Sequence, residues 1–101
     1  MKTKYLIAID DFCANHNIDI SFIISLEQTG LIEITTIEQS GFIAADQLLE
    51  LEKYVRFYYE LDINLEGIET VTHLLQNINN LQLEISTLTN RLHLYESEWN
   101  V

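Results

Sequence analysis

The chain has 101 residues, 48% of them hydrophobic, with one cysteine and a net charge of -11. This length predicts one small domain. No apolar run is long enough for a membrane span, and there is neither a signal-peptide pattern nor a second cysteine to pair, so we expect a cytoplasmic protein. A chain this acidic repels phosphate backbones and attracts basic surfaces.

The N-terminal residues predict a short strand followed by a helix. Residues 5–9 are apolar, as in a strand, and Asp10 or Asp11 can cap the helix that comes next. Phe12 and Cys13 would lie on the buried side of that helix.

A second helix begins about three residues after the first one ends. Asp19 or Ser21 can cap it, and Gly30 stands where a helix often stops in the left-handed conformation. Two helices joined by so short a connection form a helix-turn-helix, and we expect that motif here. The residues that recur near helical spacing in the second helix are Ile20, Phe22, Ile23, Leu26 and Thr29.

The next segment predicts a β-hairpin and a third helix. Residues 32–37 alternate and are rich in β-branched side chains, and residues 41–43 resume this pattern, which indicates a small wing. A helix is expected over residues 45–61, with Arg56 placed to pair with Glu60. Its buried side would carry Leu48, Leu51, Tyr54, Val55 and Tyr58.

The last helix has the most regular pattern in the chain. Asn64 can cap it, Glu66 stands at its positive end, and residues 65–95 would run roughly 45 Å. From Val71 onward, apolar residues follow alternating steps of three and four, which is the heptad of a coiled coil. The a positions are Val71, Ile78, Ile85, Leu92 and Trp99, and the d positions are Leu74, Leu81, Leu88 and Tyr95.

This heptad seam is longer than the preceding domain can cover, and it therefore predicts a two-fold homodimer, with helices parallel or antiparallel. We expect a winged helix-turn-helix domain over residues 1–62 and a dimerising helix over residues 63–101, together one compact unit. The dimer interface would comprise Leu74, Ile78, Leu81, Ile85, Leu88 and Leu92.

The charges are unevenly distributed. The five basic residues are Lys2, Lys4, Lys53, Arg56 and Arg91, so the 48 residues from Tyr5 to Glu52 hold no cation. Solubility alone does not readily explain so long a segment without one. Nine carboxylates fall in the same segment: Asp10, Asp11, Asp19, Glu27, Glu33, Glu38, Asp46, Glu50 and Glu52.

The order of helix-turn-helix, wing and long dimerising helix resembles that of the MerR-type regulators. Within that superfamily the sequence is similar to the CbpM chaperone modulator proteins, from Leu6 to about Leu94. The fold expected from this resemblance is mainly α: a MerR-like winged helix-turn-helix with a small β-wing and a long C-terminal coiled-coil helix. The resemblance rests on residues 11–13, 30–33, 42–43, 55–56, 60–61, 67–68 and 88–92.

Members of the CbpM family bind the J-domain of a CbpA- or DnaJ-like co-chaperone and inhibit it in competition with DnaK. The resemblance therefore implies a protein-binding inhibitor with no chemistry of its own. A J-domain presents a basic helix to DnaK, and an acidic competitor would be complementary to it. We expect the partner to contact Asp10, Asp11, Ser21, Ile24, Glu27 and Glu33.

A MerR-like transcription regulator is the alternative function. DNA-binding members carry arginines in the second helix and wing, where this sequence has Ser21, Ile24 and Ile43. Duplex affinity depends largely on cations that neutralise phosphates, and only Gln28 remains to read bases, so DNA binding is disfavoured. A purely structural dimerisation module is a third possibility.

Several residues also have a simpler interpretation. Ile23 and Ile24 are adjacent, so one belongs to the core, and the exposed one is either a scattered surface residue or an interface anchor. Cys13 fits a small buried hydrophobe, and the three histidines are too dispersed for a metal site. No nucleotide loop or hydrolase motif occurs, so we expect no enzymatic activity, cofactor or metal.

Overall fold

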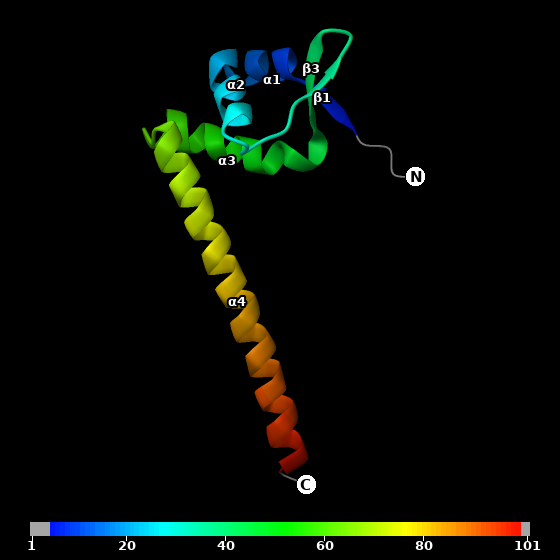
Figure 1. Ribbon diagram of the computed structural model, residues 1–101, viewed down its shortest axis with the longest axis vertical. Coiled ribbons are helices and arrows are strands. Elements are labelled where there is room, and N and C mark those ends of the chain that lie inside the picture. Colours follow the sequence, from blue (N-terminus) through cyan, green and yellow to red (C-terminus); the bar gives the residue numbers. More distant parts are fainter. Residues whose placement is uncertain (1–4, 100–101) are drawn as a thin grey trace. The chain divides into compact units, whose positions relative to one another are not determined.

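The computed structural model describes residues 5–99, without the side chain of Trp99, the residue expected at the last a position. The chain divides into two compact units, residues 1–69 and residues 70–101 (Figure 1). The elements are β1 (Leu6–Ala8), α1 (Ile9–His16), α2 (Ile20–Gln28), β2 (Thr35–Ile37), β3 (Ser40–Ala44), a 3-10 helix η1 (Ala45–Gln47), α3 (Leu48–Tyr59) and α4 (Leu65–Trp99). This confirms the mainly α fold with a small sheet and a long C-terminal helix.

The helix-turn-helix is held by local backbone contacts. Asn17 ends α1 in the left-handed conformation (φ 54°), and the Ile18 N–H donates to the Cys13 carbonyl at 3.1 Å. The Asp19 carboxylate accepts from the Ser21 N–H at 3.3 Å, which confirms a cap predicted for α2. Gly30 follows α2 with φ 83°, as predicted for the residue that stops it.

The cap predicted for α1 is wrong. Asp10 and Asp11 lie inside its first turn, and Ala8 stands at the N-cap position with no side-chain hydrogen bond. The reason is that β1 runs directly into α1 without a connecting residue, so the capping position falls on the last strand residue. The two carboxylates instead lie near the positive end of the helix dipole, where negative charge stabilises the helix.

The wing belongs to a three-stranded antiparallel sheet of order β1-β3-β2. The predicted hairpin is confirmed, but its first strand begins at Thr35 rather than at residue 32. The backbone of Glu33 pairs with the Gln47 side chain instead of a strand: its N–H donates to Oε1 at 2.9 Å, and its carbonyl accepts from Nε2 at 3.2 Å. Ile32 lies in the same connection and buries its side chain.

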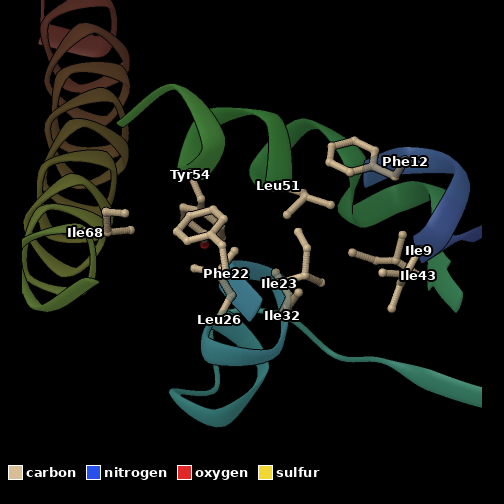
Figure 2. Packing of buried hydrophobic residues seen from close by; sticks show 10 residues of the cluster. All are labelled: Ile9, Phe12, Phe22, Ile23, Leu26, Ile32, Ile43, Leu51, Tyr54 and Ile68. Atoms are coloured by element: carbon tan, nitrogen blue, oxygen red, sulfur yellow. The ribbon is translucent and has the colours of Figure 1, made fainter. Parts of the chain in front are cut away.

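One core joins the elements of the first unit. Ile23 and Leu26 of α2 and Leu51 of α3 are each at most 1% exposed, and their side chains converge between the two helices (Figure 2). The full cluster takes residues from all four α-helices, β3 and the α2–β2 connection: Ile9, Phe12, Phe22, Ile23, Leu26, Ile32, Ile43, Leu51, Tyr54 and Ile68.

The third helix differs from its prediction at both ends, because it begins as η1 and its last turn leaves the core. Leu51 and Tyr54 are buried as predicted, and Leu48 and Val55 pack against the cluster. Tyr58, predicted on the buried side, is 40% exposed. The predicted pair of Arg56 and Glu60 is confirmed, with Nε and Oε2 3.6 Å apart.

The long helix begins as predicted and extends to Trp99. The Asn64 side-chain oxygen accepts from the Gly67 N–H at 2.8 Å, which caps its first turn. Ile68 is fully buried in the core of the first unit, so this unit extends past residue 62 into α4. In the second unit the a and d residues from Leu74 to Tyr95 are each 50–63% exposed. Within residues 5–99, no helix has the length and apolarity that crossing a bilayer requires.

The wing turn offers a test of the fold. Glu38 (φ 51°) and Gln39 (φ 67°) both have positive φ, as in a type I′ turn, although neither is glycine. We expect Gln39→Gly to raise the free energy of unfolding by about 0.5–1 kcal/mol, because glycine adopts this conformation without strain. Urea denaturation measures the change. Ser40→Gly, inside β3, should lower stability, and equal effects from the two variants would contradict this explanation.

Candidate functional site

The buried stripe of α2 determines which residues the helix presents outward. Phe22, Ile23 and Leu26 face the core, whereas Ile24 is 43% exposed. The prediction that one of the two adjacent isoleucines is buried and the other exposed is therefore confirmed. The outward face, which we call the α2 face, consists of Ile20, Ser21, Ile24, Glu27 and Gln28, all exposed.

The six residues predicted to contact a partner come from three segments. Ser21, Ile24 and Glu27 share the α2 face, Asp10 and Asp11 lie in the first turn of α1, and the sixth, Glu33, lies in the α2–β2 connection. All six are exposed. Within residues 5–99, no side-chain hydrogen bond or ion pair links them to one another, so only the three on α2 form a contiguous group by their position.

From the sequence, Ile43 was matched to a wing position at which DNA-binding members carry arginine, and this match is wrong. Ile43 is fully buried, with its backbone paired to Ile7 of β1, and it cannot contact a partner. It lies on the central strand of the sheet, four residues beyond Gln39 of the wing turn, and its side chain belongs to the core. The exposed tip of the wing carries Ile37, Glu38 and Gln39 instead.

The cations of the described chain do not supply a phosphate-binding surface. Lys53 Nζ lies 3.5 Å from Glu50 Oε1 on α3, and Arg56 of α3 is paired with Glu60, the residue that follows the helix. Such exposed pairs add little stability, but each lowers the positive charge available to a ligand. The third described cation, Arg91, lies on α4 in the second unit. Neither the α2 face nor the wing tip carries a basic residue.

An aromatic groove lies beside the α2 face, and the sequence did not predict it. Phe22 stacks on Tyr58 with ring centroids 4.4 Å apart, and Tyr58 meets Tyr59 edge to face at 5.0 Å. The Asp19 N–H donates to the Tyr59 hydroxyl at 3.1 Å. These residues line a hollow of about 720 Å³, here called the tyrosine groove, together with Asn17, Ile18, Ser21, Ser25 and Leu65.

Two further hollows share Tyr59 with the tyrosine groove. One, of about 510 Å³, has Glu52, Arg56 and Glu60 in its lining, and the other, of about 370 Å³, includes Asp62. With Asp19 in the tyrosine groove, each of the three hollows has at least one carboxylate in its lining. The only signal of the groove in the sequence is the adjacent tyrosine pair at the end of α3, and helical spacing places the first of the two on the buried side.

The cysteine and the histidine of α1 are explained by packing and hydrogen bonding within the fold. Burial raises the pKa of the Cys13 thiol above its ordinary value, and the charges of Asp10 and Asp19 raise it further, so the thiol stays protonated and unreactive at neutral pH. His16 stacks on Phe12, and its Nδ1 donates to the Phe12 carbonyl at 3.1 Å. Between residues 5 and 99, no group of three or more His, Cys, Asp or Glu side chains is placed to hold a metal ion.

Comparison with protein families identifies the fold. The MerR HTH family of regulatory proteins matches this sequence over residues 7–90, which span the helix-turn-helix, the wing and most of α4. The chain belongs to this family. It is a family of regulatory helix-turn-helix proteins rather than of enzymes. Comparisons with curated proteins and with solved structures give no significant match.

The two adjacent isoleucines of α2 form a matched pair for a stability test. Ile23→Ala should cost about 2–5 kcal/mol of folding free energy, because it opens a cavity in the core. Ile24→Ala should cost less than about 1 kcal/mol, because its side chain is nearly half exposed. Thermal or urea unfolding measures both. Similar losses for the two variants would mean that the α2 face is covered in the folded protein.

Proposed function

We propose that this MerR-family protein is a protein-binding modulator that inhibits a DnaJ- or CbpA-type co-chaperone through its J-domain, in competition with DnaK. The observation that carries the proposal is the absence of any basic residue from the α2 face and the wing tip. These are the surfaces with which a winged helix-turn-helix would read DNA. The resemblance to the CbpM proteins supplies the class of partner.

Electrostatics supports a basic partner. The net charge of -11 gives the whole molecule a negative field, and the carboxylates on α1, α2 and the α2–β2 connection are exposed. Complementary charge of this kind speeds encounter and selects against acidic partners more than it adds affinity. The α2 face adds an apolar centre, Ile20 and Ile24, beside polar Ser21 and charged Glu27, which is the composition typical of protein interfaces.

A DNA-binding regulator is the second candidate, and membership of the MerR family favours it. Duplex binding draws most of its free energy from neutralised phosphates and released counterions. Phosphate neutralisation requires cations, but the charged residue of the α2 face is Glu27 and that of the wing tip is Glu38. DNA binding therefore needs contacts of an unusual kind or a second chain that supplies the charge.

We further propose that the protein acts as a homodimer through α4. The a and d residues of its heptad lie on one side of a helix of 35 residues, and those from Leu74 to Tyr95 are at least half exposed. An apolar stripe of this length on a single helix is the pattern that a coiled coil buries. A two-fold dimer would use the same stripe on both subunits.

The co-chaperone proposal is tested with a purified J-domain in a DnaK ATPase assay. We expect the protein to suppress the stimulation of DnaK by the J-domain, and calorimetry to detect a complex that weakens as salt rises from about 50 mM to about 500 mM, because exposed charges are screened. Unchanged stimulation at saturating protein, with no complex, would exclude this function. Salt-independent binding would assign the contact to the apolar centre around Ile24.

A gel shift at low salt against genomic fragments distinguishes the second candidate. We expect no specific shift by the protein alone. A specific shift that survives excess competitor DNA would establish the DNA-binding function instead.

The dimer is tested with two leucines of similar exposure on α4. Leu81 (56% exposed) occupies a d position, and Leu83 (60% exposed) lies on the opposite side of the helix, at f. Leu81→Asp should weaken self-association by about a hundredfold or more, because it leaves an unpaired charge in the seam. Leu83→Asp adds the same charge and should leave the dimer intact. Sedimentation over a range of concentrations reads both, and a dimer that persists in Leu81→Asp would show that the seam was misassigned.

A further inference from the structure

The tyrosine groove is a rigid aromatic surface that remains open to solvent. Tyr58 and Tyr59 are 40% and 42% exposed, although α3 is buried one turn earlier at Tyr54. Both rings are nevertheless held in place, Tyr58 by stacking on Phe22 and Tyr59 by the hydrogen bond from the Asp19 N–H. A surface fixed in this way loses little conformational freedom when a ligand binds to it.

The charges around the two rings are negative. Asp19, Glu52, Glu60 and Asp62 stand in the linings of the three hollows that share Tyr59, and the one arginine there, Arg56, is already paired with Glu60. The groove also contains the N-terminus of α2, which would ordinarily attract an anion. The Asp19 carboxylate caps that terminus and offsets its positive charge. The groove therefore favours a cation.

We propose that the tyrosine groove binds an arginine or lysine side chain that a protein partner presents; this inference rests on the proposed function and names the contact surface for it. A guanidinium or ammonium group over a tyrosine ring is attracted by the electrons of its face, and a planar guanidinium can stack on it. Carboxylates at the rim, Asp19 and Asp62, add charge complementarity.

The dimensions of the groove favour a protein over a small cation. Its volume of about 720 Å³ exceeds that of one side chain, and two further hollows adjoin it at Tyr59. Ser21 lines the groove and also belongs to the α2 face, so the two surfaces are continuous. A partner segment that places a basic side chain on the tyrosines can therefore cover the α2 face with its neighbouring residues.

The charges of the groove can be removed without disturbing the fold. In Asp19→Asn/Asp62→Asn, asparagine keeps the N-cap of α2, and it tolerates the positive φ of residue 62 (54°). We expect this variant to bind a purified J-domain roughly tenfold more weakly than the wild type. The control Asp46→Asn/Glu50→Gln loses the same net charge at exposed positions outside both the groove and the α2 face, and it should change affinity less than twofold. Equal losses in both variants would overturn the proposal.

The aromatic contribution is tested at Tyr58, whose ring covers Phe22. Tyr58→Leu keeps an apolar side chain there but removes the ring face, and J-domain affinity should fall roughly three- to tenfold. Tyr5→Leu, at a tyrosine that is 79% exposed outside the groove, is the matched control and should have no effect. Thermal unfolding of both variants checks the fold. Wild-type affinity in a folded Tyr58→Leu protein would overturn the proposal.

A direct probe separates this inference from the proposed function. A blocked Ala-Leu-Arg-Leu-Ala peptide should shift the ring resonances of Tyr58 and Tyr59 in NMR spectra of the full chain, and the same peptide with neutral citrulline in place of arginine should not. If the J-domain does not bind but the arginine peptide shifts these rings, the co-chaperone function fails and the basic-side-chain site stands. If the J-domain binds and neither peptide shifts the rings, the site fails. Tetramethylammonium that shifts the rings as strongly as the arginine peptide would mark a small-cation site and overturn the commitment to a protein partner.

Discussion

The burial of one stripe of α2 is the constraint on which the rest of the first unit depends. Ile23 and Leu26 are almost fully covered by residues of α3 and of the α2–β2 connection, and this fixes the rotation of the helix. Because the stripe faces inward, Ile24 and Glu27 must face outward, and a face is created that a partner can reach. Phe22 has a double role, since it closes the edge of the core and also supports Tyr58 in the tyrosine groove. The proposed interaction surface and the core are therefore built from the same helix.

The long helix α4 differs from α2, because only its first turns pack against the core. Its first turn is fixed to the first unit by Ile68, which is fully buried, and by the Asn64 cap. Beyond Thr72, every residue to Glu98 is exposed in the single chain, including apolar residues at regular heptad positions. An apolar stripe in water is unfavourable by about 25 cal/mol for each Å² left uncovered, and this cost supports the proposal that a second helix covers the stripe of α4. This is why we propose that the working form is a dimer rather than a single chain.

The sequence predicted best those features that depend on a few neighbouring residues. The caps at Asp19 and Asn64 and the helix stop at Gly30 were predicted correctly, because each depends on one side chain and the adjacent backbone. The predictions that failed depend on contacts between distant segments. Ile43 was matched to an arginine position of the DNA-reading wing, because the pairing of β3 between β1 and β2, which buries it, cannot be seen in the local pattern. The tyrosine groove was missed for the same reason, since it joins residues 17–25 to residues 58–65.

The groove and the charge distribution together give a physical account of how a DNA-reading fold can serve another ligand. The fold needs its buried stripe, its caps and its wing, and none of these requires a cation at the surface. The arginines that a DNA reader carries can therefore be replaced without loss of the fold, as at Ser21 and Ile24. Once they are gone, the exposed carboxylates disfavour phosphate and favour a basic surface. Charge alone selects a class of partner, whereas the fixed rings of Tyr58 and Tyr59 add the geometry with which one basic side chain could be distinguished from bulk positive charge.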